Sequence, residues 1–395
     1  MEESIHVLNL SSYTAPPVVE NPRNDWVEYG EDNNYFQYLI DRYNGSPTNN
    51  AAVNGISEMI YGRGLEATDS EENAEAYAKM RELFRKDCMK KICYDYKMMG
   101  QAALQIIYSK DRSRIVEVKH IPVETLRAEK AELGKVEAYY YHPDWSDLRR
   151  DEKPKRIPAF GSSKEGLEIL YIRPYKAGFY YYSPVDYQGG LQYAELEEEI
   201  ANYHINNIQN GLQPSMLINF NNGTPSKEIR DEIERSIYEK FSGTSNAGRF
   251  ILAFNDSKEL AASIEPVVLN DAHQQYQFLS DESMKKVMVS HRIVSPMLVG
   301  IKDNSGLGNN AQELETASIL MDNTVIRPMQ VTIIDALEEI LEYNEINLDL
   351  YFMTLQPLEF TDLTNAMTDA EVEKETGVKP SEVQRQEEIN EETEE

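Results

Sequence analysis

Hydrophobic positions in the first hundred residues recur at the three- and four-residue spacing of amphipathic helices. Helices are therefore predicted over 33–43, 50–60 and 71–99. Gly62-Arg63-Gly64 breaks the pattern once, and Gly100 follows the last predicted helix, as a C-cap residue would. Residues 1–30 carry scattered turn signals, so we expect an irregular arm there.

Beyond Gly100 the period of the pattern changes from that of helices to that of strands. Short runs rich in β-branched and aromatic residues are bounded by Gly, Pro, Asp and Ser. The predicted strands are 101–108, 115–120, 136–142, 167–173 and 179–182. Helices followed by strands are typical of an α+β domain, which we expect to end near residue 190.

A helix with one apolar face is predicted after Gly189-Gly190, and Asn210-Gly211 ends it. The residues of this face are Tyr193, Leu196, Ile200 and Tyr203. A small insert follows the helix. Its expected elements are a strand over 215–220, a helix from 224–226 to 241, a strand over 249–254 and an extended piece over 264–269.

A second long helix is predicted from Asp271 to Val294. One face carries Tyr276, Leu279, Val287 and Val294, and the opposite face carries Gln274, Asp281, Lys285 and Arg292. Residues 301–310 are polar and glycine-rich, so a loop is expected. A third long helix is expected over 311–343, with a kink where Arg327-Pro328 interrupts it.

The charge of the chain restricts its partners. It has 395 residues with 39 basic and 68 acidic side chains, a formal net charge of −29. Such a surface repels phosphate, which disfavours tight DNA binding over a broad basic face but is compatible with DNA passing without adhesion. Residues from about Asp362 onwards are acidic and poor in aromatics, and we expect disorder there. No run approaches the ~18–20 apolar residues that span a bilayer, so no membrane partner is expected.

The candidate motifs for catalysis, cofactors and metals lack the neighbouring residues that each such site requires. Cys88 and Cys93 are five residues apart on a predicted helix, which is poor geometry for a bridge or shared metal. Gly306-Leu307-Gly308 lacks the third glycine of a dinucleotide site, and no Lys-Ser/Thr follows Gly243–Gly248. Ser283–Lys286 matches Ser-x-x-Lys without its companion motifs. The six histidines show no ligand spacing. We therefore expect no enzyme activity, cofactor or metal.

Short motifs follow one another in a specific order over residues 183–343. They are Ser183-Pro184-Val185 before the first long helix, Asn210–Ser215 before the insert, Ser242–Arg249 within it, Val294–Gly300 after the second helix, and Ile326-Arg327-Pro328 in the third. In this order they resemble the portal proteins of long-tailed bacteriophages. The part before residue 183 is similar mainly in position and element type. Little ordered chain is expected after Tyr343, so any crown is expected to be small.

The resemblance implies a division of the chain into the parts of a portal subunit. These are an α+β wing over 1–192, a first stem helix over 193–211, a small α/β clip over 212–268, an antiparallel second stem helix over 269–294, a tunnel loop over 295–312, a kinked helix with a small crown region over 313–361, and an acidic tail over 362–395.

The resemblance also implies a homo-oligomeric ring of about twelve subunits at one capsid vertex of a virion. Its implied partners are the major capsid protein, the terminase large subunit, a head-completion adaptor, and double-stranded DNA passing without sequence specificity. The residues expected nearest DNA are Lys302, Asn304, Asn309 and Asn310 in the tunnel loop, with Gln274, Asp281, Lys285 and Arg292 as channel-facing candidates of the stem. Candidate clip contacts are Lys227, Arg230 and Arg235.

Other interpretations of these features remain open at this point. Residues 301–310 could form an ordinary surface loop, and the basic residues of the clip could lie on a solvated helix face. The whole chain could be another ring protein of the virion such as an adaptor, although adaptors are usually smaller. An enzyme with an unrecognised α+β site would need a pocket of converging groups with shifted pKa values.

Overall fold

The N-terminal helices of the chain begin and end at the residues that favour such boundaries. The computed structural model describes residues 15–149, 152–163, 166–209, 216–220, 225–241, 250–254, 272–301 and 310–355. The first helices are α1 (Tyr35–Gly45), α2 (Pro47–Tyr61), α3 (Ala74–Leu83) and α4 (Lys86–Met99). The Ser46 hydroxyl accepts a hydrogen bond from the Asn49 amide and caps α2. Gly100 ends α4 in the left-handed conformation, with φ 74°.

The single helix predicted over 71–99 is wrong, because the chain breaks between α3 and α4. Phe84 has φ −100° and ψ 76°, and Arg85 is extended at φ −64° and ψ 142°. The break directs the Phe84 ring into the same core that receives Leu83 and Met89. Burial of this large ring therefore outweighs the helical hydrogen bonds lost at the turn.

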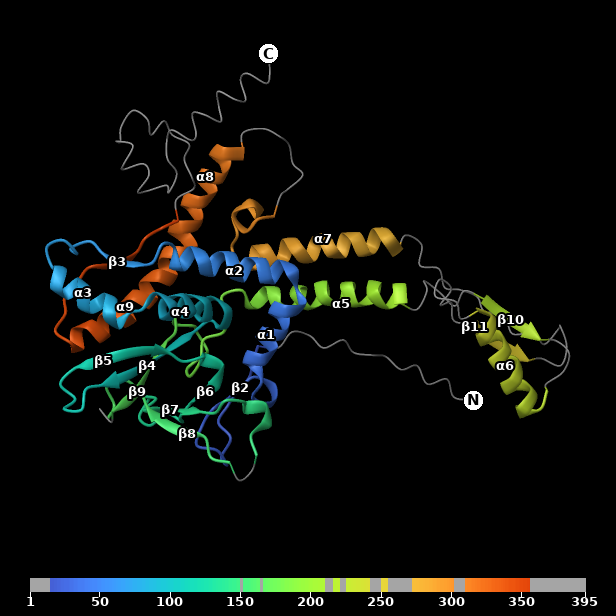
Figure 1. Ribbon diagram of the computed structural model, residues 1–395, viewed down its shortest axis with the longest axis horizontal. Helices are drawn as coiled ribbons and strands as arrows, with labels where there is room; N and C mark the ends of the chain where they lie inside the picture. The colour runs from blue at the N-terminus through green and yellow to red at the C-terminus, as the bar shows by residue number, and fades with distance from the viewer. Residues whose placement is uncertain are drawn as a thin grey trace, which may run out of the picture. The chain divides into compact units, whose positions relative to one another are not determined.

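The strands form small antiparallel sheets beneath these helices (Figure 1). One sheet has the order β5–β4–β9, from strands Ile115–His120, Ala102–Tyr108 and Leu167–Ile172. Another has the order β6–β7–β8, from strands Leu126–Ala128, Ala138–Tyr141 and Lys155–Pro158. A parallel bridge between Ala159 and Ile169 connects the two sheets. The predicted α+β class is confirmed.

Residues 179–182 do not form the predicted strand. Tyr181 and Tyr182 instead connect distant segments, because both rings are buried while their hydroxyls reach backbone or carboxylate partners. The Tyr182 hydroxyl donates to the Val27 carbonyl over 2.6 Å and accepts from the Ala128 amide over 3.0 Å. The Tyr181 hydroxyl donates to Glu20 over 2.6 Å.

The described part of the N-terminal arm is more ordered than predicted. Strands β1 (Val18–Val19) and β2 (Glu28–Tyr29) pair with each other. Val27 and Tyr29 are buried, and the Tyr29 ring stacks on Tyr182 with centroids 4.3 Å apart. Val27 and Tyr29 therefore belong to the second core, and residues 1–14 lie outside the described chain.

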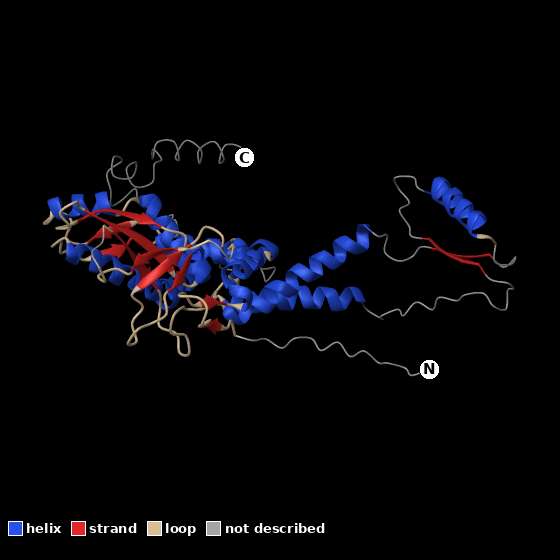
Figure 2. Ribbon diagram, turned by 90° about the horizontal axis from the view of Figure 1, so that it is seen from below, coloured by secondary structure: helices blue, strands red, loops and turns tan. Residues whose placement is uncertain are grey.

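The apolar side chains of this part of the chain form two cores. The first lies between α2, α3, α4, the β5–β4–β9 sheet and the long helix near the C-terminus. The second lies between α1, the β6–β7–β8 sheet and residues 181–191. Figure 2 shows the strands in red with helices around them. Strands β3 (Leu65–Ala67) and β12 (Leu350–Phe352), which the sequence did not predict, pair at the edge of the first core.

The C-terminal half follows the predicted order of elements. The helices are α5 (Leu191–Gln209), α6 (Lys227–Phe241), α7 (Ala272–Ser290), α8 (Asn310–Met321) and α9 (Arg327–Tyr343), with a π-helical turn η7 (Asp322–Ile326) between the last two. Strands β10 (Met216–Phe220) and β11 (Phe250–Phe254) flank α6. The short 3-10 turns are η1 (Glu31–Asn33), η2 (Val123–Thr125), η3 (Trp145–Asp147), η4 (Gln188–Gly190) and η6 (Pro296–Val299).

Candidate functional site

Helices α5 and α7 form an antiparallel pair (Figures 1 and 2). Near the end of α5 the Tyr203 ring stacks on Tyr276, near the start of α7, with centroids 4.5 Å apart. At the opposite end of the pair, a Cβ on Gly190 would collide with the side chain of Ser290. Glycine is therefore needed for this close approach. The predicted antiparallel pair of long helices is confirmed.

The base of α5 is fixed to α1 and α2 by its acidic residues. The Glu197 carboxylate accepts hydrogen bonds from the Ser46 hydroxyl and from the Thr48 hydroxyl, the latter over 2.7 Å. It also accepts from the Thr48 amide over 3.3 Å, at the N-terminus of α2, where a negative charge is favoured. Glu198 forms an ion pair with Arg42 over 3.1 Å. These carboxylates therefore fix the position of α5 against α1 and α2 and are not simply exposed to solvent.

A buried lysine lies where the α5–α7 pair joins the two cores. The Lys97 side chain of α4 is 0% exposed, and its Nζ lies 2.8 Å from Asp186 Oδ1. Arg292 approaches the same carboxylate over 3.4 Å. Burial lowers the pKa of Lys97, and the Asp186 carboxylate opposes that shift. The ion pair therefore compensates a charge that the surrounding core would otherwise disfavour.

A buried histidine lies beside this ion pair. His291 Nε2 is 2.8 Å from Asn49 Oδ1, and its ring stacks on Tyr187 with centroids 4.2 Å apart. Burial, and secondly the charge of Lys97, lowers the pKa of His291 well below its usual value. His291 is therefore a neutral structural residue at neutral pH, and it connects the end of α7 to the start of α2.

The described residues on either side of the predicted tunnel loop are well defined. After α7 the chain forms η6 and then turns at Gly300, which has φ 78°. Val299 packs against α2 so closely that a Cβ on Gly55 would lie 3.0 Å from Val299 Cγ1. Helix α8 begins at Asn310. Residues 302–309 lie outside the described chain.

The long helix formed by α8 and α9 is interrupted at η7, in the turn before Pro328. Met321, Ile326 and Arg327 all keep right-handed helical backbone angles, so α8 continues through η7 into α9. The interruption is a π-helical turn that directly precedes Pro328, in the position where the ring removes a helical hydrogen bond. The turn directs Val325 and Ile326 into the first core.

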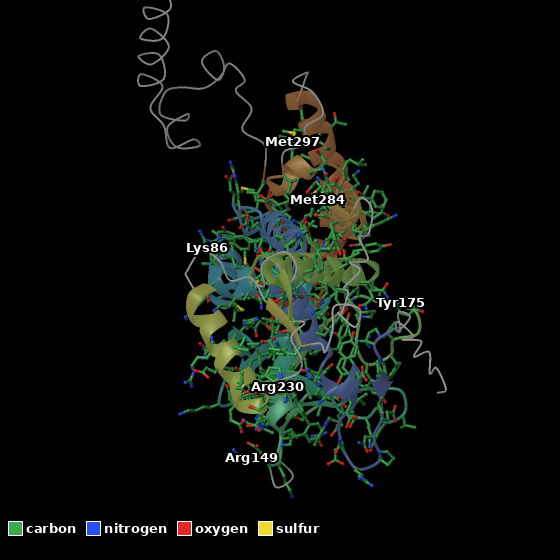
Figure 3. The ribbon with its side chains drawn as sticks, turned by 90° about the vertical axis from the view of Figure 1, so that its right-hand side faces the viewer. Lys86, Arg149, Tyr175, Arg230, Met284 and Met297 are labelled. Carbon is green, nitrogen blue, oxygen red and sulfur yellow. The ribbon has the colours of Figure 1, made fainter. Side chains whose placement is uncertain are left out.

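The insert between α5 and α7 is a small β-α-β unit. Strands β10 and β11 are parallel, in register from Met216–Phe250 to Phe220–Phe254. Parallel strands need a crossover connection, and α6 lies between them in the chain. Lys227, Arg230 and Arg235 are exposed on α6, and Arg230 is labelled in Figure 3. The predicted extended piece over 264–269 lies outside the described residues.

The structure separates the predicted site residues into distinct groups. Lys302, Asn304 and Asn309 lie outside the described residues, while Asn310 begins α8 and Gln274 lies in α7. Asp281 and Lys285 are exposed on α7. The placement of Arg292 on the α7 helix is wrong. It lies after the end of α7 with φ 58°, because the chain turns there to bring the guanidinium towards Asp186.

Sequence reasoning missed two exposed apolar residues on the same side of α7. Phe278 is 64% exposed and Val289 is 71% exposed. They are eleven residues apart and each lies near Lys285 on the helix surface, because three turns of helix take about eleven residues. The predicted polar face of α7 therefore also carries apolar side chains. The signal was present in the helical periodicity, which placed both residues beside Lys285.

Among the residues that the structure describes, no group of three or more His, Cys, Asp or Glu side chains could hold a metal ion. Both cysteines are buried and free, and burial raises the pKa of Cys88 to about 11. Among the described helices, none is long and apolar enough to cross a membrane.

Comparisons with known proteins identify the fold. No protein-family model and no curated protein matches the sequence. A chain from the neck of an empty gene transfer agent (GTA) particle, computed with C6 symmetry, matches with a TM-score of 0.55 at 16% identity, covering 87% of this chain and 94% of that chain. A chain from the neck of a native GTA particle, computed with C12 symmetry, matches with a TM-score of 0.54 at 14% identity, covering 92% of each chain.

A further match extends to a named phage protein. An HK97-family phage portal protein from Corynebacterium diphtheriae gives a TM-score of 0.47 at 13% identity, covering 78% of this chain and 92% of that chain. At that score the likeness carries no argument by itself. The GTA matches show that this chain has the fold of chains from the neck of a GTA particle.

Proposed function

We propose that this chain is a portal subunit, one of a ring of about twelve copies at a capsid vertex through which double-stranded DNA enters and leaves. The observation that carries the proposal is the antiparallel α5–α7 pair around a β-α-β insert, followed by a loop and a long helix. The same fold occurs in the neck of a GTA particle computed with C12 symmetry. On this proposal α5 and α7 are the stem, the insert is the clip, and residues 302–309 belong to the tunnel loop.

A ring multiplies each charge of the subunit around the channel. With a net charge of −29 for each chain, the ring repels phosphate over a Debye length of ~8 Å. The repulsion keeps DNA mobile, because strong phosphate contacts would make every step a binding event. Lys302, Asn304, Asn309 and Asn310 are the proposed exceptions, which steady the duplex in the narrowest part.

The tunnel loop is tested by shortening it. Deletion of Gly306–Gly308 in a particle that depends on this protein should reduce the amount of DNA packaged or retained, because the loop would no longer reach the duplex. The control replaces the same three residues with Ser-Gly-Ser and keeps the length of the loop. Unchanged DNA content after the deletion would contradict the channel role of these residues.

The clip is the proposed docking site for the packaging motor and later for the head-completion adaptor. Lys227, Arg230 and Arg235 are exposed on α6 and would contact acidic surfaces of the terminase large subunit and then of the adaptor. The test is Arg230→Glu with Arg235→Glu, which should weaken motor binding at low salt. The matched control is Lys86→Glu with Arg149→Glu, two exposed residues also labelled in Figure 3. Equal binding by both variants would contradict the proposal.

We call the two cores, with the helices and sheets around them, the body of the chain. The body is the proposed contact region for the major capsid protein and for neighbouring subunits. An adaptor is the second candidate, because chains from the neck of GTA particles share this fold. The stem pair with its clip and loop favours the portal, because this order is the one that the portal resemblance requires. A portal variant without function should leave capsids empty of DNA, whereas an adaptor variant should leave capsids that fill and then leak.

A further inference from the structure

A tight turn at the tip of one hairpin of the body exposes a leucine completely. Leu133 and Gly134 lie between Glu132 and Lys135, which exchange two backbone hydrogen bonds of 3.1 and 3.0 Å. Leu133 has φ 49°, a left-handed conformation that is unfavourable for a residue with a side chain. It is 108% exposed, so packing within the described chain does not compensate this strain. A strained and exposed leucine at a tip indicates a role in contact with another segment.

A second turn lies beside this leucine and adds two tyrosines. Lys176 and Phe179 form an antiparallel bridge around the turn, and Tyr175 and Tyr180 directly precede and follow them. The Tyr180 hydroxyl donates a hydrogen bond to the Gly134 carbonyl, so the two tips are in contact. Tyr175, which is labelled in Figure 3, is 88% exposed, and Tyr180 is 48% exposed. The two tips therefore form one exposed apolar surface.

The N-terminal arm runs along this surface. Glu20 accepts a hydrogen bond over 2.6 Å from the hydroxyl of Tyr181, the residue after Tyr180. Val19, the residue before Glu20, is 43% exposed. We call Val19, Leu133, Tyr175 and Tyr180 the tip patch. The described chain begins at Ala15, four residues before Val19, so the residues that precede it leave the body close to the tip patch.

The sequence before Ala15 contains a segment whose chemistry matches the tip patch. Within residues 5–10, four of six positions are apolar. They are Ile5, Val7, Leu8 and Leu10. Apolar side chains gain free energy when they leave water, so contact stabilises both the segment and the patch.

The charges beside the two surfaces also match. Lys135 and Lys176 lie next to patch residues in the chain, against one carboxylate, Glu132. This gives the surroundings of the tip patch a small positive excess. Glu2 and Glu3 precede the apolar segment and carry the opposite charge.

The segment is long enough to reach the tip patch of its own chain. Leu8 lies seven residues before Ala15. An extended chain spans roughly 3.3 Å per residue, so this stretch covers about 23 Å. Val19 is itself part of the patch and lies only four residues beyond Ala15. The chain can therefore turn back and cover the patch without strain in the arm.

We propose that residues 5–10 dock on the tip patch of the same chain. The apolar side chains of the segment cover Leu133 and the rings of Tyr175 and Tyr180. The contact gives the strained leucine its function, because the left-handed turn holds its side chain towards the segment. This inference does not depend on the proposed portal function, since the contact lies within one chain.

Cross-linking in the full-length protein tests the docking. Leu8→Cys combined with Leu133→Cys should form a disulfide under mild oxidation and give a monomer that migrates faster on a non-reducing denaturing gel. The matched control is Leu8→Cys with Val116→Cys, which places the second cysteine at an exposed position on β5 and should form no such bond. The native cysteines do not interfere, since both are buried and burial raises their pKa values.

Each outcome of the cross-linking decides the inference. A faster-migrating monomer from the Leu8 and Leu133 pair, but not from the control, supports docking within one chain. Covalent dimers would place the segment on another copy and overturn the inference. Equal mobility of the two double variants would also overturn it, because the tip patch would then have a different occupant.

Substitution of the leucine gives an independent check. Leu133→Gly removes the side chain and relieves the left-handed backbone, so the fold of the hairpin is retained. Chymotrypsin should then cleave after Leu8 and Leu10 roughly tenfold faster, because cleavage follows the open population of the segment. Leu133→Met keeps an apolar side chain and should keep the slow cleavage. Mass spectrometry of the released peptides measures both rates, and equal rates would show that the inference is wrong.

Discussion

The α+β body and the α5–α7 pair differ in where they place their large apolar residues. In the body, such residues fill two cores, and even the rings of Tyr29, Tyr182 and Tyr187 are fully buried. On the α5–α7 pair, Ile205, Phe278 and Val289 are each more than half exposed. The pair is held to the body by polar contacts at its base, through Glu197 and His291.

The difference shows where each region obtains its stability. The body buries two apolar cores within its own chain. The α5–α7 pair leaves apolar surface exposed, and on the proposed portal function other copies of the chain would cover it. Substitutions in the body should therefore act on the free energy of unfolding, whereas substitutions on the exposed side of the α5–α7 pair should act on assembly.

The largest effect is expected at the junction of the two regions. Asp186→Ala leaves the Lys97 ammonium buried without its partner and should cost about 3–5 kcal/mol of unfolding free energy. The double change Lys97→Met with Asp186→Leu removes both charges and should cost much less. Chemical denaturation measures both variants. Equal losses would mean that the pair carries no charge compensation.

A core cavity should have a somewhat smaller effect. Leu337 on α9 is fully buried in the first core, so Leu337→Ala should reduce the free energy of unfolding by about 2–5 kcal/mol. Val331 on the same helix is 54% exposed, and Val331→Ala should change it by less than about 0.5 kcal/mol. Denaturant midpoints at equal slope compare the two variants. Similar losses would contradict the position of the core.

The buried His291 predicts a pH dependence. Its pKa in the folded chain is lowered, whereas in the unfolded chain it is about 6.5. As pH falls below 6.5, the unfolded chain binds more protons than the folded chain at this site, so stability decreases until the folded pKa is reached. His291→Gln should flatten that part of the pH profile. His204→Gln, at an exposed site on α5, should leave it unchanged.

The smallest effect on folding is expected at Phe278, an exposed residue of α7. Phe278→Ser should change the free energy of unfolding of the monomer by less than about 0.5 kcal/mol, because the side chain is mostly exposed. Denaturation at low protein concentration measures this value. A loss of several kcal/mol would show that Phe278 has a structural role within its own chain and would weaken the contrast between the two regions.

Periodicity predicted the long elements because their burial follows a regular pattern. Helices α5 and α7 and strand β4 each lie within a few residues of the predicted range, since apolar residues recur regularly along each of them. Strands β3 and β12 are only three residues long, too short to show a period. The break at Phe84 depends on a tertiary core that no local pattern reveals.

The candidate site was predicted less well than the fold. Lys285 and Arg230 are exposed, as the polarity of their positions predicts. The Lys97–Asp186 pair joins residues 89 positions apart, and its partners meet only through the fold. The polar pattern of α7 predicts that its charged residues are exposed. It does not predict the exposure of Phe278, which depends on which side of α7 is covered by α5.

Electron microscopy of the purified protein tests the central claim most directly. Class averages viewed down the particle axis should show a ring of about twelve copies around a bore wide enough for duplex DNA. The stem pairs should appear as a band of parallel rods that surrounds this bore. Particles without an axial opening, or monomers at every concentration tested, would contradict the account.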